Sequence, residues 1–344
     1  MQIISILRMT KEQINKLILE DNFPGSCNKP ELIETHISWV FLCDEFVYKI
    51  KKPIHYSFLD FSSIDKRKYY CQREIELNRR LTENIYVDVQ PVSKLRNQIF
   101  IGNEEGEIID YAVRMRRLDR DKQMNMLLMN NKVTGTNIQN LARKIANFHR
   151  STDVIYQKDF LDVQEKFNDL LSEKDYLREN LSKGSANLID CAVDVSNAFL
   201  TKNKELLSAR LKAGFFRDCH GDLHSRNIFL LPSPQAFDCI EFNDDFRRID
   251  VLNEVAFLCM DLDVFGRHDL SDLFMKCYND LFPTIKNEED QKLLIYYKSY
   301  RSNVRAKVNS LRARDEKSDT ARKLIIAEVD RYLRLMESYT KEVE

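Results

Sequence analysis

The chain has 344 residues, of which 43% are hydrophobic, so it can bury a sizeable core and is long enough to form two lobes. Its 53 Lys and Arg residues nearly balance its 54 Asp and Glu residues, and the net charge of -1 excludes a global field that would attract nucleic acid or an anionic membrane. We therefore expect neither as a partner, and any recognition of charge must be local.

The cysteines and the N-terminal residues indicate in which cellular compartment the protein is expected. The eight cysteines are scattered without a C-x-x-C pair, which favours buried reduced thiols over a zinc ribbon or a disulfide scaffold. The first residues, MQIISILRMTKEQ, lack a basic start and a small-residue cleavage site, and no apolar run reaches membrane-spanning length. We expect a cytoplasmic protein. No G-x-x-x-x-G-K-[ST] motif occurs, which argues against a P-loop ATPase domain in this chain.

Residues 34–53 predict a β-hairpin. Apolar side chains alternate with other residues along both arms, and Asp44 and Glu45 mark the turn. On the second arm Lys49 points to the face opposite Tyr48, because successive side chains of a strand alternate between faces.

Residues 62–81 predict a helix that begins at Ser63 or Asp65. Its apolar stripe would contain Tyr70, Leu77 and Leu81. Strand-like segments follow and would complete a small antiparallel sheet before about residue 117; they are 85–95, 98–102 and 108–115.

The remainder of the chain is mainly helical in pattern. Helices are predicted at 141–150, through 160–212 up to a stop at Gly214, and from about 249 onward. Three short strands interrupt them, at 215–219, 227–231 and 235–240. The outline is α+β, with a sheet-rich N-terminal lobe at 1–117 and a larger, mainly helical C-terminal lobe at 118–344.

The segment CHGDLHSRNIFLLPSPQAFDCIEFND carries the residues best suited to chemistry. His220-Gly221-Asp222-x-x-x-x-Asn227 lies on a loop between two predicted strands, and Asp238 follows eleven residues after Asn227 on the next strand. Transfer of a γ-phosphoryl group needs a carboxylate that orients and deprotonates the acceptor hydroxyl, and oxygen ligands that hold Mg²⁺. Asp222 suits the first role, and Asn227 and Asp238 suit the second.

The same segment admits two other interpretations. His220-x-Asp222-x-His224 could place alternate side chains on one metal ion, but the remaining histidines offer no second paired spacing for a metal hydrolase. An ordinary polar hairpin would explain the residue types but not three oxygen ligands at this spacing. Both are disfavoured.

The H-x-D-x-x-x-x-N spacing matches the catalytic loop of protein kinases, although no D-F-G or A-P-E follows. H-G-D-x-x-x-x-N instead resembles the aminoglycoside phosphotransferase-like kinases, which share the protein-kinase fold and phosphorylate small molecules. THISWVFL, VYKIKKP, CQREIELNRRL and FDCIEFNDDFRRIDVLNEVAFLCMDL resemble the bacterial subgroup that often carries a C-terminal P-loop ATPase domain, over roughly residues 30 to 310. The resemblance implies a bilobal protein-kinase-like fold, ATP and Mg²⁺ as cofactors, and a separate ATPase as a conceivable partner.

This fold needs a strand lysine that binds the nucleotide phosphates and a helix glutamate that pairs with it. Lys49 lies inside the predicted strand, whereas Lys51 and Lys52 look like its solvated end, with Lys51 as the fallback because it shares the face of Lys49. Glu74 falls on the apolar stripe of the helix and would need a cation there, whereas Glu76 would lie on the surface. Lys49 and Glu74 are therefore the predicted nucleotide-binding pair.

Supporting roles are predicted around this set. His220 would hold the loop, Arg226 would steady Asp222 or a phosphate, and Glu241 would either supplement metal binding or face solvent. His224 would either pack against the loop or contact the substrate.

The residues that cover the nucleotide phosphates are not glycines, because no Gly occurs between residues 30 and 50. The candidates are His36, Ser38 and the turn 43–45. The hinge that would hold adenine is expected near 111–115.

Residues 298–314 contain six basic and no acidic residues on a helical pattern. The plain interpretation is a solvated face; the sharper one is that Arg301 and Arg305 bind an anionic group of the acceptor. A cationic aminoglycoside would then be a poor substrate, because antibiotic kinases receive amino groups with acidic residues. The predicted activity is phosphoryl transfer from ATP·Mg²⁺ to a small-molecule hydroxyl; a protein kinase and a non-catalytic nucleotide-binding scaffold are the alternatives.

Overall fold

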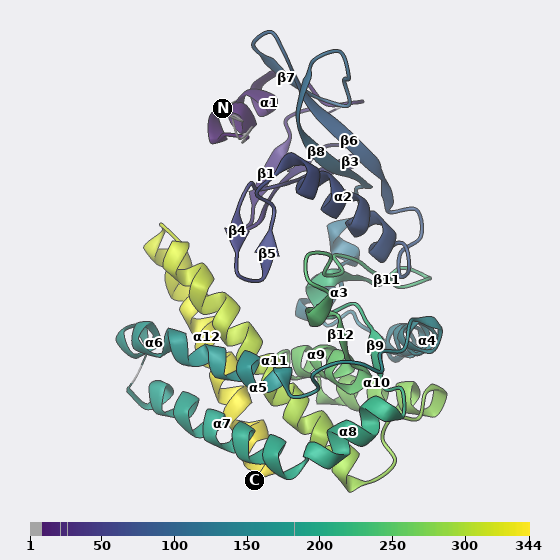
Figure 1. Ribbon diagram of the computed structural model, residues 1–344, viewed down its shortest axis with the longest axis vertical. Coiled ribbons are helices and arrows are strands. Elements are labelled where there is room, and N and C mark those ends of the chain that lie inside the picture. The colour runs from purple at the N-terminus through teal and green to yellow at the C-terminus, as the bar shows by residue number, and fades with distance from the viewer. Residues whose placement is uncertain (1–8, 21, 26, 182) are drawn as a thin grey trace. The chain divides into compact units, whose positions relative to one another are not determined.

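The computed structural model describes residues 9–20, 22–25, 27–181 and 183–344 (Figure 1). The first eight positions of the predicted N-terminal lobe lie outside the described residues. The chain divides into two compact units, Met1–Gln123 with Gln235–Phe246 as unit 1 and Met124–Pro234 with Arg247–Glu344 as unit 2. The predicted division at residue 117 left the segment 235–246 in the C-terminal lobe, whereas the structure groups it with unit 1.

Unit 1 is built on a six-stranded antiparallel sheet with the order β1-β2-β3-β8-β6-β7 (Figure 1). The predicted hairpin is confirmed, with Ser38 of β2 opposite Lys51 of β3, and the three later strands are confirmed as well. The strands are β1 (Glu31–Glu34), β2 (Ser38–Leu42), β3 (Phe46–Lys51), β6 (Tyr86–Leu95), β7 (Gln98–Ile101) and β8 (Glu107–Arg116), with the small hairpin β4 (His55–Tyr56) and β5 (Leu59–Asp60) beside them and β11 (Gln235–Ala236) later in the chain.

The two faces of this sheet pack against different helices. Trp39, Phe41, Tyr48 and Ile50 enter a core with α1 (Lys11–Glu20), a helix that the sequence pattern had not predicted. The alternating residues Lys49 and Lys51 therefore point to the other face, which α2 (Ile64–Asn78) covers (Figure 1). The strand period alone thus brings both lysines to the side of α2.

Helix α2 begins where the sequence predicted. The side chain of Ser63, its N-cap residue, accepts a hydrogen bond from the Lys66 backbone N–H. Glu74 is fully buried on the sheet side of the helix, as its place on the apolar stripe implied. The helix is fixed to β8 by a buried ion pair, in which Arg67 Nε donates to both carboxylate oxygens of Asp110, at 2.9 and 3.0 Å.

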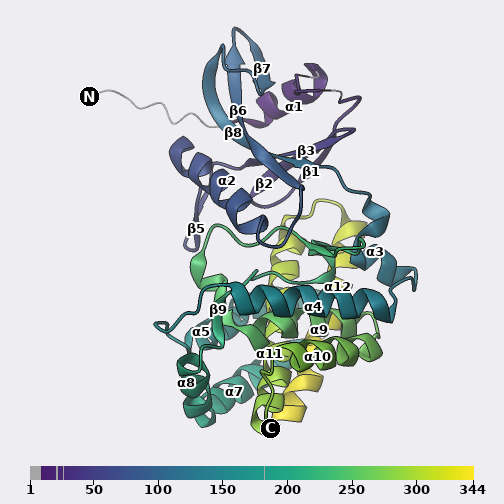
Figure 2. The same cartoon turned by 90° about the vertical axis from the view of Figure 1, so that its right-hand side faces the viewer.

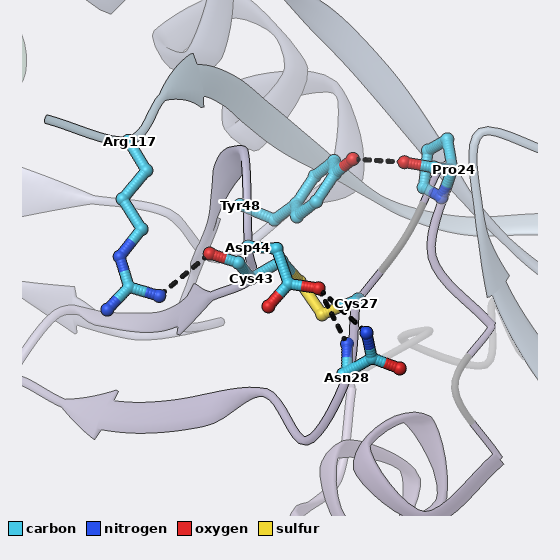
Figure 3. Close-up of a disulfide and its surroundings, with 7 residues drawn as sticks. All are labelled: Pro24, Cys27, Asn28, Cys43, Asp44, Tyr48 and Arg117. Carbon is cyan, nitrogen blue, oxygen red and sulfur yellow. Dashed lines mark hydrogen bonds between the residues drawn. A yellow bond between two sulfur atoms is a disulfide. The ribbon is translucent and has the colours of Figure 1, made fainter.

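A disulfide corrects the prediction of reduced thiols. Cys27 is bonded to Cys43 at the β2–β3 turn, 16 residues along the chain, and both are buried (Figure 3). Asn28 donates from its backbone and its side chain to Asp44, at 3.2 Å each, beside the bond. The remaining six cysteines are free. Spacing could not predict the bond, because folding of the segment before β1 onto the sheet brings the two residues together.

Unit 2 is mainly helical, as predicted. Helix α9, which is buried along almost its whole length, packs against α10 and α11, while α4 runs along α10 (Figure 2) and α11 along α12. The helices are α3 (Met124–Met129), α4 (Gly135–Ser151), α5 (Asp162–Asn168), α6 (Lys174–Asn180), α7 (Lys183–Lys202), α8 (Lys204–Lys212), α9 (Val251–Val264), α10 (His268–Leu281), α11 (Glu288–Asp315) and α12 (Asp319–Val343). Among the described residues, none of the helices combines the length and apolar character needed to cross a bilayer.

Short strands lead into and out of the motif-bearing loop. β9 (Phe216–Asp218) pairs antiparallel with β12 (Arg248–Asp250), and β10 (Ile228–Phe229) follows the loop. Gly214, with φ 78°, ends the preceding helical stretch in the left-handed conformation that the prediction of a helix stop requires. The buried Arg247 donates to Asp218 across this strand pair, at 2.6 Å from its Nε, so the loop leaves from a fixed base.

Candidate active site

In unit 1, three predicted residues meet. Lys49 Nζ donates to Glu74 Oε1 at 2.9 Å and to Asp238 Oδ1 at 2.7 Å. Lys49 comes from β3 and Glu74 from α2, while Asp238 follows β11, which ends at Ala236. Asp238 was expected on a strand and instead lies just after one. A strand lysine paired with a helix glutamate is the arrangement that positions the phosphate-binding lysine of kinases.

A second lysine lies behind the first. Lys51 is fully buried, donates to Glu74 Oε2 at 2.6 Å and is hydrogen-bonded to Glu241 Oε1. Lys51 was expected to be solvated and is not, because the strand period points it at α2. Glu241 is 5% exposed, so of its two predicted alternatives the solvent-facing one does not hold.

The opposite charges of the lysines and carboxylates in this cluster stabilise the ionised forms of Lys49 and Glu74. Burial would lower the pKa of Lys49, but the carboxylates of Asp238 and Glu74 raise it well above its ordinary value. Burial would raise the pKa of Glu74, but Lys49 and Lys51 hold it at about 2. The lysines are therefore cationic and Glu74 is ionised at neutral pH.

Asp238 has an unusual backbone. Its φ of 61° places it in the left-handed region, which Asp tolerates better than most residues. Its N–H donates to Tyr86 Oη at 3.1 Å, and the next N–H, of Cys239, donates to Asn78 Oδ1 at 2.9 Å. The side chain is 46% exposed, and within the described residues its Oδ2 accepts no hydrogen bond. The carboxylate is thus held by one oxygen and presents the other.

The turns near the lysines lack glycine. Thr35 Oγ1 accepts from the backbone of Ser38 at 2.9 Å and closes the turn between β1 and β2. Because Ser38 lies opposite Lys51, this turn is at the lysine end of the hairpin, whereas the turn 43–45 is at the other end. Of the two turns, the one between β1 and β2 is therefore better placed to cover phosphates bound at the lysines. The predicted hinge, 111–115, is the interior of β8 and pairs with β3 and β6, so its backbone groups are not available to adenine.

In unit 2, the motif loop is anchored by a residue that the sequence had not singled out. The buried Glu254 of α9 accepts from the backbone of His220 at 2.6 Å and of Gly221 at 3.0 Å. His220 Nδ1 in turn accepts from the Asp222 backbone at 3.2 Å, which is the loop-supporting role expected for it. Glu254 was detectable only as a carboxylate in the first turn of a mainly apolar helix.

The Asp222 carboxylate is oriented by its neighbours. Asn227 Nδ2 donates to Asp222 Oδ2 at 2.8 Å, and His224 Nε2 lies 3.3 Å from the same oxygen. In the described part of the chain, Asp222 Oδ1 and Asn227 Oδ1 accept no hydrogen bond. Burial would raise the pKa of Asp222, but His224 and Arg305 bring it below its ordinary value. The result is an ionised carboxylate with one uncommitted oxygen.

The predicted arginines behave differently from one another. Arg301 is 5% exposed, donates to Asn253 Oδ1 at 2.7 Å and to Gly221 O at 3.2 Å, and thereby holds the motif loop. Arg305 is partly exposed and lies over the ring of Tyr332. Arg226 contacts Glu328 at 3.4 Å.

A hydrolase-type metal centre at His220-x-Asp222-x-His224 is not favoured by the geometry. His224 Nδ1 accepts from the Arg226 backbone at 3.2 Å, and His220 Nδ1 is engaged within the loop. Among the described residues, the His, Cys and acidic side chains that lie close enough together to hold a metal ion are His149, Cys219 and Glu254. The triplet His220, Asp222 and His224 does not form such a group.

No protein-family model matches the chain. The chain is 33% identical over 310 residues to an uncharacterized protein of Mycobacterium tuberculosis and, to the same extent, to one of Mycobacterium bovis. These matches cover 86% of this chain but 58% of each relative, so the chain spans less than two thirds of their length.

Solved structures identify the fold. Spectinomycin phosphotransferase, solved with ADP and spectinomycin, has a TM-score of 0.51 at 10% identity, over 96% of this chain and 98% of that one. An ethanolamine kinase of Plasmodium vivax has a TM-score of 0.50 at 11% identity, over 95% and 87%. The chain therefore has the protein-kinase-like fold of the aminoglycoside phosphotransferases and ethanolamine kinases, as the resemblance implied.

Proposed function

We propose that this protein is a phosphotransferase that moves the γ-phosphoryl group of ATP to a hydroxyl of a small molecule, with Mg²⁺. The observation that carries the proposal is the pairing of Lys49 with both Glu74 and Asp238 in one unit, on a fold used by small-molecule kinases. The oriented Asp222–Asn227 pair of the other unit supports it. The fold alone is compatible with functions other than phosphoryl transfer. The charged residues named above are what favour phosphoryl transfer among them.

Each residue has a defined role. Lys49 binds the nucleotide phosphates, and Glu74 positions its ammonium group. Asp222 Oδ1 orients the acceptor hydroxyl and accepts its proton as the oxygen attacks the γ-phosphorus. The uncommitted oxygens of Asp238 and Asn227 are the hard donors that Mg²⁺ prefers, so each unit offers one candidate ligand for the ion, which would neutralise phosphate charge.

The acceptor is proposed to be anionic. Arg301 is engaged with the motif loop, so the proposal rests on Arg305, which lies near enough to Asp222 to lower its pKa and retains a partly exposed side chain. A guanidinium beside the base suits a carboxylate or phosphate on the acceptor. A cationic aminoglycoside would be repelled there.

The test uses purified protein, Mg·ATP and a pooled metabolite extract. The expected result is a phosphorylated small molecule whose formation falls by at least about 10³-fold in Asp222→Ala while ATP still binds, because the general base is lost and the phosphate-binding residues remain. Asp121→Ala, at an exposed acidic residue, is the control.

Three other outcomes would point elsewhere. ATP binding without any phosphorylated product supports the non-catalytic scaffold, and labelling of added protein supports a protein kinase. Efficient phosphorylation of cationic aminoglycosides, with none of anionic hydroxyl compounds, would refute the anionic acceptor. The cytoplasmic location and the separate ATPase partner stay predictions.

A further inference from the structure

The ion pair between Lys51 and Glu241 lies next to the Lys49–Glu74–Asp238 contact and has no role in the proposed mechanism. We propose that Lys51 and Glu241 are positioning residues that hold the segment carrying Asp238 in the conformation that binds Mg²⁺. The inference rests on the proposed function. It replaces the predicted alternative in which Glu241 supplements metal binding, because Glu241 is buried and hydrogen-bonded to Lys51.

The connectivity of the cluster carries the first step. Lys49 and Lys51 share one face of β3, and the two oxygens of Glu74 accept from one lysine each. Lys49 continues to Asp238 and Lys51 to Glu241, three residues further on. The segment from Asp238 to Glu241 is therefore tied to the same strand and the same glutamate at both of its ends.

The Lys51–Glu241 and Lys49–Asp238 contacts differ in how deeply they are buried. Lys51 is fully buried and Glu241 is 5% exposed, whereas the Asp238 side chain is 46% exposed. A charged pair removed from water is stable only in close geometry, because each group has lost its hydration and has few other partners. The Lys51–Glu241 pair is thus the fixed tie, and Asp238 is the end that remains free to exchange Lys49 for a metal ion.

The backbone shows what the tie has to hold. Asp238 adopts φ 61°, a left-handed conformation that carries a steric cost for any residue with a Cβ, so contacts that hold it there matter. Tyr86 and Asn78 fix the N–H groups of Asp238 and Cys239 from the sheet and from α2. Glu241 supplies the restraint on the C-terminal side, so that the left-handed residue is held from both directions.

The test is the double variant K51M/E241M, which removes one charge of each sign and keeps similar side-chain volumes. ATP binding is measured by calorimetry with and without Mg²⁺, and thermal unfolding checks that the variant is folded. We expect ATP affinity without Mg²⁺ to stay within about twofold of wild type, because Lys49 and Glu74 remain. The gain in affinity on adding Mg²⁺ should fall at least about tenfold, because Asp238 is no longer held.

The matched control is K52M/E34M, which removes a partly exposed Lys–Glu pair, 2.8 Å apart, that joins the ends of β3 and β1. It should leave the Mg²⁺ gain unchanged. E241Q, which keeps an oxygen for Lys51, serves if the double variant does not fold, and it should reduce the gain by a smaller factor. A folded K51M/E241M protein, or a folded E241Q protein in its place, with the full Mg²⁺ gain would overturn the inference alone. A wild-type protein that gains nothing from Mg²⁺ would overturn the proposed function as well.

Discussion

At the scale of single residues, Glu74 is the hub of the unit 1 cluster. Its buried carboxylate accepts hydrogen bonds from Lys49 and Lys51. Burial would raise its pKa, but the two lysines hold it at about 2, below the ordinary 4.5. Ionised Glu74 therefore stabilises the fold fully above pH 4.5, and this contribution is lost as the pH falls toward 2.

We expect Glu74→Gln to lower the free energy of unfolding at pH 7 by about 3 kcal/mol, because two buried lysines lose a shared carboxylate. The difference from wild type should shrink as the pH falls from 4.5 toward 2. Denaturant unfolding at several pH values measures both effects. Glu76→Gln, at a side chain that is 67% exposed, is the control and should change stability by less than about 0.5 kcal/mol. A pH-independent loss in Glu74→Gln would contradict the assignment.

Arg301 could either bind the acceptor or hold the motif loop in place. It donates to Gly221 O and to Asn253, which favours the loop. We expect Arg301→Lys to lower kcat about tenfold with little change in the KM of the acceptor, because the fork of two donors is lost and the position of Asp222 is loosened. Arg312→Lys, on the exposed face of the same helix, should have no effect. A raised acceptor KM at unchanged kcat would instead favour substrate binding.

At the scale of elements, the β2–β3 turn is tied to two other segments of unit 1. The disulfide joins Cys43 to Cys27 ahead of β1, and Arg117, just after β8, donates to Cys43 O at 2.8 Å (Figure 3). Tyr48 Oη donates to Pro24 O at 2.7 Å. The segment before β1 is thus held against the sheet by covalent and polar contacts.

We expect C27A/C43A to lower the free energy of unfolding by about 3 kcal/mol, because a closed loop of this length restricts the unfolded chain. Denaturant unfolding of the oxidised protein measures this loss, and a reductant should produce a similar one in wild type. Cys191→Ala, which removes an exposed free thiol, is the control and should leave stability unchanged. Equal stability of C27A/C43A and wild type would show that the bond contributes nothing.

At the scale of the whole molecule, each unit carries its own part of the proposed machinery. Unit 1 contains Lys49, Glu74 and Asp238, and unit 2 contains Asp222 and Asn227. The segment 235–246 belongs to unit 1 although it follows the motif loop in the chain, and ion pairs join it to β3. Nucleotide binding and proton transfer should therefore be separable by mutation.

We expect Mg·ATP at about 100 times its Kd to stabilise wild type by about 2.7 kcal/mol, because the ligand binds the folded chain and not the unfolded one. Lys49→Met should abolish the rise in unfolding temperature, and Asp222→Asn should retain it. Calorimetric scans with and without Mg·ATP measure the shift. Retention of the full shift in Lys49→Met would refute the role given to this lysine.

The sequence by itself determined the fold class, the β2–β3 hairpin, the helix that begins near Ser63 and the pairing of Lys49 with Glu74. Strand and helix periods are local, and the spacing of the motif residues matched a known chemical arrangement. Because a period states which face a side chain takes, it placed Glu74 inside the protein and required a cation for it.

Only the tertiary structure decided the rest. Lys51 and Glu241 are 190 residues apart, and no local pattern indicates that they meet. The same holds for Glu254 beneath the motif loop, for the Cys27–Cys43 bond and for the engagement of Arg301 with Gly221. The physical reason is common to all four: each contact joins segments that only folding brings together.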